Sequence, residues 1–386
     1  MTLHVFNPDH DLALASGLEN FTAPHAGRQL RHDLGWLPAM WADENDCVLV
    51  DDVPTALKSI RHRRVSCRQF VSYQQIASLP ITHIEPWGWN AALCAQLRRF
   101  GVDSGRWNVE SGKRHDWLDT IRELSHRRTA AQLLPQLQTD GTVGEATECT
   151  TMDEVQALVS KYGKAVLKAP WSSSGRGVRF LSSPNGQSSA WPKDVCNQHD
   201  ARMIHDQSLD GWLRNTLQRQ GSVMVEPFYT KMRDFGMEFY SDGKGSVTYL
   251  GLSLFHTSNG AYTGNIIATE QAKREMLSRY LPTPLLDQTQ ERICQIMGNV
   301  FNNKYQGPFG IDMMVVSPPS CLPQLGEVDY VLKALHPCVE INLRRTMGHV
   351  ALSLDSVYNP TADDEVRHVM RINYFNNNYK LQIRRQ

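Results

Sequence analysis

The sequence has no excess of charge of either sign. Its 40 lysine and arginine residues balance 40 aspartate and glutamate residues among 386, so the formal net charge is +0. A protein dedicated to nucleic acid usually carries a basic surplus that neutralises phosphates. The sequence also has no apolar run that approaches the roughly 18 residues of a membrane-spanning helix. We therefore expect neither nucleic acid nor a membrane as a partner.

Cysteine motifs and targeting signals are also lacking. The eight cysteines are widely spaced, with no CxxC pair and no zinc-binding spacing. The first residues lack the basic and apolar regions of a signal peptide, so we expect reduced thiols and a cytoplasmic location. Hydrophobic residues make up 41% of the chain, too many for a disordered protein. At about 150 residues per domain, the length predicts two or three domains.

The first part of the chain alternates short apolar runs with helical patterns. We expect strands at Leu3–Phe6, Cys47–Val50 and Thr82–Ile84, with helices at Pro24–Leu34 and Trp89–Phe100. Strands that alternate with helices predict a small parallel α/β domain. A long helical segment, Asp116–Leu134, is expected to end at Pro135 and to connect this domain to the rest.

The later part of the chain is rich in strands. Thr151 and Glu154 form a capping box that predicts a helix as far as Gly163. Another helix is expected to begin at Asp287, with one apolar stripe made of Ile293, Ile296, Met297, Val300 and Phe301. Strands are expected at Lys164–Ala169, Ser222–Phe228, Gly236–Tyr240, Ser246–Phe255, Phe309–Ser317 and Cys338–Leu343. Consecutive strands with few helices predict an antiparallel sheet packed on long helices.

A lysine near the end of a strand precedes a loop of serines and glycines. Lys168 is followed by Ser172, Ser173, Ser174, Gly175, Arg176 and Gly177. Glycines let the backbone approach a ligand closely, and successive N–H groups form an anion-binding nest. A flexible surface loop is the alternative, but a buried strand lysine needs an anionic partner. The segment matches neither GxxxxGK[ST] nor GxGxxG.

Two further segments carry polar groups at strand ends. Glu226 and Pro227 end an apolar strand, where freed backbone groups can read an adenine edge; a solvated glutamate on an edge strand is the alternative. Asp234, downstream, is a candidate for contact with a ribose or a cation. Glu340 and Asn342 alternate on one strand and so share a face. Together with Asp312, these oxygen donors suit Mg²⁺, although an ion pair between Glu340 and Arg344 is an equal alternative.

The order of these motifs resembles the ATP-grasp superfamily, in which ATP lies between two α+β subdomains and drives carboxylate activation. The resemblance covers roughly residues 125–350. It implies that Lys168 binds the α- and β-phosphates and that residues 172–177 cover the β- and γ-phosphates. It also implies an adenine hinge at Glu226, Phe228 and Tyr229. Asp312, Glu340 and Asn342 would bind two Mg²⁺ ions, and Arg344 would act with Lys168 on the transferred phosphoryl group.

The sequence departs from the family in two places. Where the family usually has a lysine before the capping box, this chain has His126, Arg127 and Arg128. Arg127 or Arg128 could replace that lysine as a cation, and we take Arg128 as a phosphate ligand. The stretch 317–337 is long for a link between the two metal-binding strands. We expect an α/β N-terminal domain at 1–105, a connecting segment at 106–124, and an α+β ATP-grasp fold with subdomains at 125–225 and 226–386.

These expectations define a function and its alternatives. We expect an ATP- and Mg²⁺-dependent ligase that joins small-molecule carboxylate and amine (or thiol) substrates, and a homodimer is common in the resembled class. A small-molecule kinase on the same scaffold and a non-catalytic ATP sensor are the alternatives. The clusters 9–11 and 85–90 follow strands of the N-terminal domain, where open α/β sheets bind ligands. By similarity they belong to the acceptor site, whereas helix capping is the other interpretation of residues 9–11.

Overall fold

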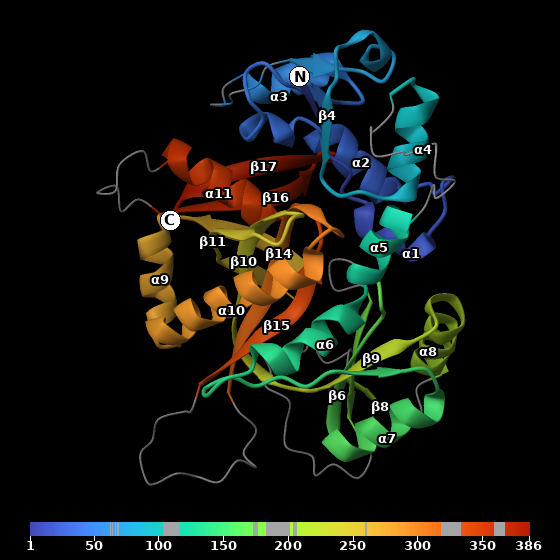
Figure 1. Cartoon of the computed structure of the whole chain (residues 1–386), viewed down its shortest axis with the longest axis vertical. Coiled ribbons are helices and arrows are strands. Elements are labelled where there is room, and N and C mark those ends of the chain that lie inside the picture. The colour runs from blue at the N-terminus through green and yellow to red at the C-terminus, as the bar shows by residue number, and fades with distance from the viewer. Residues whose placement is uncertain are drawn as a thin grey trace.

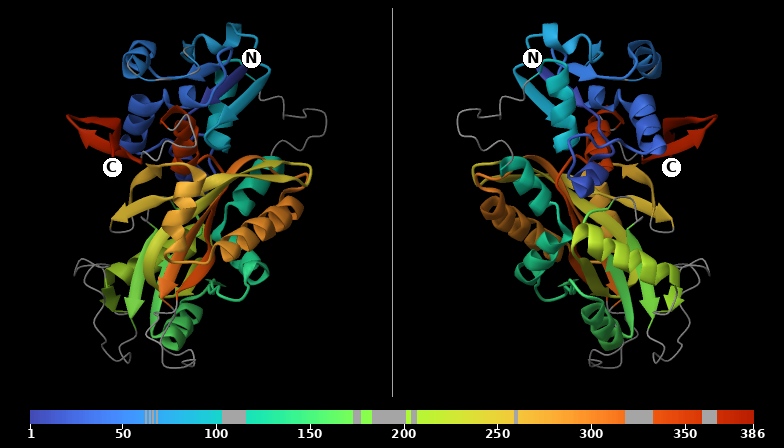
Figure 2. Two further views of the ribbon diagram at one scale, coloured as in Figure 1. Left: turned by 90° about the vertical axis from the view of Figure 1, so that its left-hand side faces the viewer. Right: turned by 90° about the vertical axis from the view of Figure 1, so that its right-hand side faces the viewer.

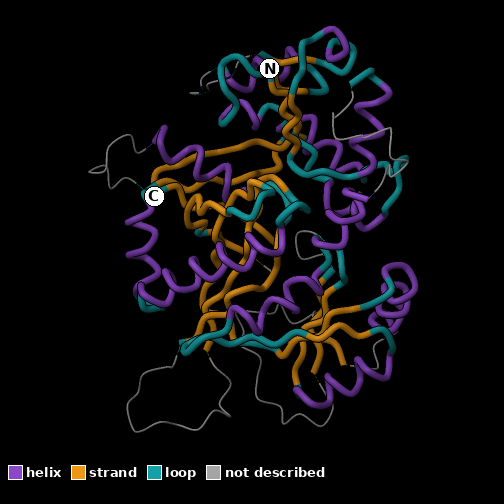
Figure 3. Tube along the Cα trace, in the orientation of Figure 1, coloured by secondary structure: helices purple, strands orange, loops and turns teal. Residues whose placement is uncertain are grey.

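The computed structural model describes residues 1–61, 63, 65, 67, 69–102, 116–172, 177–182, 201–203, 207–258, 261–317, 333–358 and 367–386. Within these residues the strands form four sheets (Figures 1 and 3). No helix in this part of the chain is long and apolar enough to cross a membrane. The six cysteines in the described part are free thiols, as the sequence predicts.

The N-terminal sheet is parallel throughout and has the strand order β3-β2-β1-β4. Buried apolar side chains such as Leu3 and Val48 form the strands, and Asp52 and Asn90 cap the helices α3 and α4. The strands are β1 (Thr2–Val5), β2 (Cys47–Leu49), β3 (Phe70–Val71) and β4 (His83–Pro86). The helices are α1 (His10–Ser16), α2 (His25–Leu34), α3 (Val53–Ile60) and α4 (Ala91–Arg99), with two short 3₁₀ turns, η1 (Leu37–Met40) and η2 (Ile76–Ser78). The predicted parallel α/β domain is confirmed.

The connecting segment differs from the single helix that we expected. It contains two helices, α5 (Asp116–Leu124) and α6 (Arg127–Leu137), and Pro135 lies inside α6 instead of ending it. The break falls at His126, whose backbone is extended and whose Nδ1 accepts a hydrogen bond from the Arg128 N–H at 3.0 Å. A side-chain cap of this kind starts a new helix, because it satisfies one of the free N–H groups of the first turn.

The second sheet has the order β5-β9-β6-β7-β8 and is covered by α7 (Met152–Tyr162) and α8 (Gln207–Gln220). Its strands are β5 (Thr147–Cys149), β6 (Lys164–Lys168), β7 (Val178–Ser182), β8 (Ala201–Met203) and β9 (Val223–Pro227). The capping box of α7 is confirmed, since both the Thr151 and the Glu154 hydrogen bonds are present and Gly163 ends the helix. Val159 of α7 and Leu213 of α8 pack with Leu167 and Val225 of the sheet.

The third and fourth sheets are antiparallel. The third has the order β11-β10-β14-β15 and the fourth the order β12-β13-β16-β17. Their strands are β10 (Thr230–Asp242), β11 (Val247–Ser253), β12 (Phe255–Ser258), β13 (Ala261–Ile267), β14 (Gln306–Ser317), β15 (Ala334–Asn342), β16 (His368–Phe375) and β17 (Asn378–Arg385). The helices α9 (Glu270–Ser278), α10 (Thr283–Phe301) and α11 (Met347–Tyr358) accompany them. An α/β domain followed by α+β units is therefore the fold class, as predicted.

Several expected boundaries were wrong; the strand expected at Gly236–Tyr240, for example, is the longer β10. The helix expected at Asp287 begins at Thr283, because Pro284 suits the first turn of a helix, where its missing N–H costs nothing. Of its apolar stripe, Ile293, Met297 and Phe301 are fully buried, and the other two residues are partly buried. The strand expected at Cys338 begins at Ala334, so the end of the stretch 317–337 belongs to β15.

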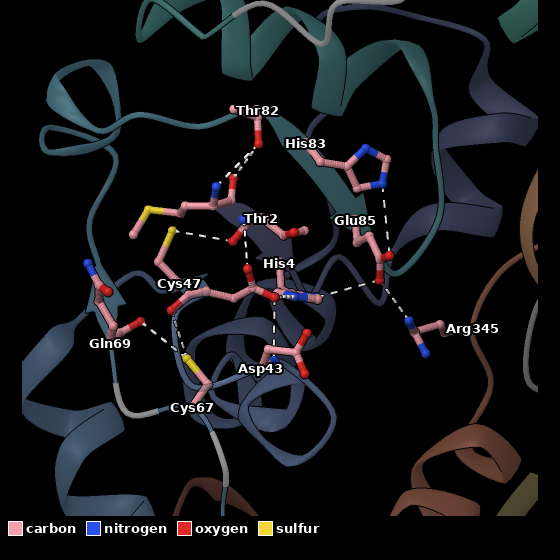
Figure 4. Close-up of polar contacts among 12 residues, drawn as sticks. Thr2, His4, Asp43, Cys47, Cys67, Gln69, Thr82, His83, Glu85 and Arg345 are labelled. Carbon is pink, nitrogen blue, oxygen red and sulfur yellow. Dashed lines mark hydrogen bonds and ion pairs between the residues drawn. The ribbon is translucent and has the colours of Figure 1, made fainter.

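Contacts between distant parts of the sequence fix the N-terminal sheet against the C-terminal sheets. The Arg344 guanidinium binds both carboxylate oxygens of Asp11, at 2.9 and 2.8 Å. Arg345 donates to Glu85 at 2.9 Å, and Glu85 also lies near His4, as Figure 4 shows. The Tyr379 N–H donates to Asp33 at 2.7 Å. The carboxyl ends of β1 and β4 thereby meet the end of β15.

We expect Asp11→Asn to lower the free energy of unfolding by about 1–3 kcal/mol at neutral pH, because the charged hydrogen bonds to Arg344 are lost. Burial acts to raise the pKa of Asp11, but Arg344 outweighs it and holds this pKa below the usual 3.8. The ion pair therefore contributes fully above about pH 4, and its contribution is lost as pH falls through the lower folded pKa.

Urea unfolding of the wild type and the variant, followed at about pH 7 and about pH 2.5, tests this expectation. The difference between them should shrink at the acidic pH. Asp119→Asn, an exposed acid on α5, serves as the control and should change stability little. An Asp11→Asn effect that is the same at both pH values would show that the carboxylate charge does not matter.

Candidate active site

The register of β14 and β15 places the candidate metal ligands on one face of the third sheet. Asp312 lies opposite Glu340, and Gly310 lies opposite Asn342. The Asn342 amide donates to Asp312 Oδ2 at 3.1 Å. Glu238 of β10 is opposite Gly310 on the same face. A side chain at 310 would meet the Glu238 carboxylate at 2.5 Å, so only glycine lets these acidic groups approach so closely.

The electrostatics of this face suit a cation. Burial, together with the carboxylates of Glu340 and Glu238, raises the pKa of Asp312 to about 8. Among the described residues, no group of three or more His, Cys, Asp or Glu side chains is arranged to hold a metal ion. The candidate set is therefore two carboxylates and an amide. This set fits Mg²⁺, which keeps several waters and usually shares its coordination with substrate phosphates.

Glu340 and Arg344 do not pair with each other, as one interpretation of the sequence had it. Glu340 accepts a hydrogen bond from Arg127 at 2.8 Å, and Arg344 binds Asp11 instead. Burial disfavours the charge of Arg344, yet Asp11, Glu340 and Asp312 together raise its pKa. Arg344 therefore stays cationic beside the candidate metal ligands.

Of the two arginines that could replace the family's lysine, Arg127 contacts the other candidate site residues, whereas our choice was Arg128. Its guanidinium donates to the Ala169 carbonyl at 2.5 Å and to Ser172 Oγ at 2.6 Å, besides Glu340. It thus links the loop after β6 to β15. Arg128 is half exposed and lies 3.5 Å from Glu148. Adjacent residues on a helix point in different directions, and only the start of α6 at Arg127 decides which arginine faces inward.

Lys168 and Glu226 form a buried ion pair, 2.6 Å apart, between β6 and β9. Ser172 follows in the loop, where its hydroxyl would collide with any side chain at Gly177. Ser173, Ser174, Gly175 and Arg176 lie outside the described residues. Lys168 therefore faces an anionic partner, as a buried strand lysine must, but in this structure the partner belongs to the protein.

The expected adenine hinge leaves the end of β9. The Phe228 N–H donates to the Lys164 carbonyl at 3.0 Å, and Phe228 packs edge-on against Phe180. The Tyr229 ring meets the His336 ring edge-on, with centroids 5.6 Å apart. Asp234 is engaged elsewhere: it accepts from Lys231 at 2.5 Å and from Thr257 at 2.7 Å.

His336 is a site residue that the sequence did not single out. It is 1% exposed at the start of β15, and neither ring nitrogen has a hydrogen-bond partner among the described residues. Burial and the nearby Lys168 lower its pKa to about 3, so the imidazole is neutral. Cys338, also buried, lies close to Lys168 and to Asp312, and burial raises its thiol pKa to about 12. Nothing in a strand pattern distinguishes such a histidine from an ordinary core residue.

The two N-terminal clusters come together at the end of β15. Asn7 donates to the Gly88 carbonyl at 2.8 Å, and Asn90 lies 3.3 Å from His10. A side chain at Gly88 would overlap the His10 ring, so the glycine permits this contact. Asp11 joins Ser172, Trp171, Glu340 and Asn342 in the lining of one small cavity. The helix-capping interpretation of Asp9 is not supported by a side-chain hydrogen bond at the start of α1.

Comparison with known proteins gives structural likenesses alone. No protein-family model matches the chain, and no curated protein matches it in sequence. The chain is similar to an N5-carboxyaminoimidazole synthetase from Staphylococcus aureus complexed with ADP, with a TM-score of 0.47 and 12% identity over 96% of this chain and 82% of the other. A biotin carboxylase complex from Campylobacter jejuni gives a TM-score of 0.49 and 12% identity over 96% and 75%. For an N5-carboxyaminoimidazole ribonucleotide synthetase from Thermus thermophilus, the TM-score is 0.45 and the identity is 11%, over 96% of this chain and 83% of the other.

The fold assignment rests on the chain's own architecture. A parallel α/β sheet precedes two α+β units, and these units carry the motifs in the order that the superfamily resemblance requires. Lys168 and the serine–glycine loop belong to the first unit, whereas Asp312 and Glu340 belong to the second. Arg127 joins the two through its hydrogen bonds. This topology and this order of motifs are the arrangement that the sequence resemblance to the ATP-grasp superfamily implies.

Proposed function

We propose that the chain is an ATP- and Mg²⁺-dependent ligase, which activates a small-molecule carboxylate as an acyl-phosphate for attack by an amine or a thiol. The observation that carries the proposal is the meeting of cationic and acidic groups from four parts of the chain. Arg127 contacts both Ser172 and Glu340, and Asp11 lies in the same cavity lining as these two residues. A site that combines phosphate-binding cations with oxygen ligands for Mg²⁺ suits phosphoryl transfer.

Two cations, Lys168 and Arg127, would bind the phosphates; in this structure each is paired with a glutamate of the protein. Lys168 would bind the α- and β-phosphates after exchanging Glu226 for a phosphate oxygen. Arg127 would contribute a fork of N–H donors, which matches phosphate geometry. The loop 172–177 would cover the β- and γ-phosphates with its backbone N–H groups. Glu226, Phe228 and Tyr229 would then border the adenine.

The residues of β14 and β15, with Arg344, would neutralise charge at the transferred phosphoryl group and hold the substrates. Asp312, Glu340 and Asn342 would hold Mg²⁺ together with phosphate oxygens, and the ion supplies positive charge at the transferred phosphoryl group. Arg344, oriented by Asp11, would hold the anionic intermediate in place. Because Asp11, which follows β1 of the N-terminal sheet, binds this arginine, we assign the carboxylate and amine substrates to that side of the site. Rate enhancement would come from positioning and electrostatics.

The first prediction from the proposed function concerns Glu340 on β15. Glu340→Gln keeps the size of the side chain but removes a charge, so we expect ADP formation to fall by about 10²–10⁴-fold. The measurement is substrate-dependent ADP release with a panel of amino acids and dicarboxylates. Glu275→Gln, an exposed glutamate on α9, should leave the rate unchanged. Loss of the cooperative unfolding transition in Glu340→Gln would instead assign this residue a structural role.

The reaction product distinguishes a ligase from a kinase. An acyl-phosphate reacts with hydroxylamine to give a hydroxamate, so the wild type should form hydroxamate and ADP in equal amounts. A stable phosphoester without hydroxamate would identify a kinase. ATP binding without turnover of any substrate would support a sensor and contradict the ligase proposal.

The second prediction compares neighbouring arginines. Arg127→Lys keeps a positive charge but cannot reach Ala169, Ser172 and Glu340 together, so we expect at least a tenfold loss of kcat/KM for ATP. Arg128→Lys should change kcat/KM by less than about twofold, because its side chain is half exposed. Equal losses in the two variants would contradict the placement of Arg127 in the site.

The third prediction concerns His336 and has opposite signs in two measurements. Replacing the buried, unpaired imidazole with leucine should raise the free energy of unfolding by about 1 kcal/mol. The same His336→Leu change should weaken ADP binding by about tenfold if a ring nitrogen pairs with the bound nucleotide. Denaturant unfolding and calorimetric titration of ADP measure the two effects. Unchanged ADP affinity would show that His336 is only part of the core.

A further inference from the structure

One face of the fourth sheet carries arginine, lysine and histidine side chains in neighbouring rows. Across β16 and β17, Arg371 lies opposite Gln382, Val369 opposite Arg384, and Asn373 opposite Lys380. Alternation along each strand puts these six side chains on the same face. On the other face, Met370 and Leu381 are buried. The hairpin β16–β17 is therefore apolar on one side and basic on the other.

The neighbouring hairpin β12–β13 continues this face. His256 lies opposite Gly264. A side chain at Gly264 would meet the Arg371 side chain at 2.9 Å and the Met370 carbonyl oxygen at 2.4 Å. Because glycine has no side chain, no atom of residue 264 fills the space between His256 and Arg371 on this face. The result is a row that runs from His256 to Gln382 across all four strands of the sheet.

The face is hollowed into a groove of about 640 Å³, a volume typical of small-molecule sites. Figure 2 shows the hairpin β16–β17 reaching outward from the body of the molecule, and none of the groove's lining residues belongs to the sheets that hold Lys168 and Asp312. The lining consists of His256, Val369, Arg371, Asn373, Gln382, Arg384, Arg385 and Gln386. No acidic side chain is among these residues.

The positive charge of the groove is not balanced by its own lining. Arg371, Arg384 and Arg385 are all exposed. Burial and the positive charges of Arg233 and Arg371 lower the pKa of His256, which leaves its imidazole neutral at pH 7. In a chain whose formal net charge is +0, this concentration of arginines is local.

Hydrogen bonds within the groove orient its polar groups. Gln382 Oε1 accepts from the Asn373 amide at 2.9 Å and from the Arg384 guanidinium at 3.3 Å. Among the described residues, Arg371 has no ion pair with a carboxylate. Guanidinium groups held apart on a rigid sheet can each offer a fork of N–H donors to anionic oxygens.

We propose that this groove is a second ligand site, which binds a small polyanion through Arg371 and Arg384. The ligand class is a molecule with several phosphate or carboxylate oxygens, because three arginine side chains line one groove that has no acidic side chain in its lining. The bounded lining of the groove fits a small molecule. A nucleic acid needs a basic stripe longer than these four strands provide. The site is independent of the proposed ligase activity, since none of its residues lines the nucleotide cleft.

Calorimetric titration of the full chain tests the proposal with two probes, inorganic pyrophosphate and citrate. Each titration is run with and without saturating ADP, so that binding in the nucleotide cleft is recognised by competition. We expect one of the two probes to bind with ADP present and to bind more weakly as salt is added. The preferred probe tells whether the groove selects phosphate or carboxylate oxygens.

Variants locate the binding. The double change Arg371→Gln and Arg384→Gln should weaken the bound probe by at least about tenfold while ADP affinity stays the same. The matched control, Arg214→Gln with Arg219→Gln on α8, removes the same charge from an exposed helix and should have no effect. Unchanged thermal unfolding of the first variant shows that the loss is not due to misfolding. Absence of binding by both probes, displacement by ADP, or equal losses in both double variants would overturn the proposal.

Discussion

Charge that is buried must be neutralised, and in this structure the protein neutralises its site with its own side chains. Lys168 pairs with Glu226, and Arg344 pairs with Asp11. Each pair joins elements that are far apart in the sequence. An isolated charge in such surroundings would be far more costly than the pair, so each pair also fixes the distance between its two elements. The positions of α1, β6, β9 and β15 depend on this constraint.

The same constraint explains how a ligand can enter. Under the proposed function, a phosphate group would supply the negative charge that Glu226 now provides, and a divalent cation would supply the positive charge that Arg127 now provides to Glu340. Binding is then an exchange of partners, in which the number of unpaired buried charges does not increase. Asp312, whose pKa is raised by its acidic neighbours, is the group with the most to gain from a cation.

Much of the site follows from local pattern, and the rest depends on contacts that sequence separation hides. The strand that carries Lys168 and the alternation of Glu340 with Asn342 are visible because strand periodicity is local. The choice between Arg127 and Arg128 is not visible, because it depends on the residue at which α6 begins. The pairing of Arg344 with Asp11 spans most of the chain, and no periodicity connects the two.

The fold shows the same division. The parallel N-terminal sheet and the capping box of α7 were predicted, since both arise from short-range chemistry. The hairpin β16–β17 was not predicted, because its exposed face is basic and its tip contains consecutive asparagines. Two of these, Asn376 and Asn377, adopt positive φ, the conformation that a tight hairpin turn requires. These asparagines were the feature of the sequence that could have predicted the hairpin turn.

The bulge between β14 and β15 has a consequence for how the protein can change. Asp312 pairs with Glu340 and Met314 with His336, so β15 carries extra residues between the two pairs. A bulge of this kind locks one alignment, because sliding the strands would misplace it along with every side chain on both faces. The alignment of β14 with β15 is therefore set within the strands themselves, and with it the positions of Asp312 and Glu340 opposite each other.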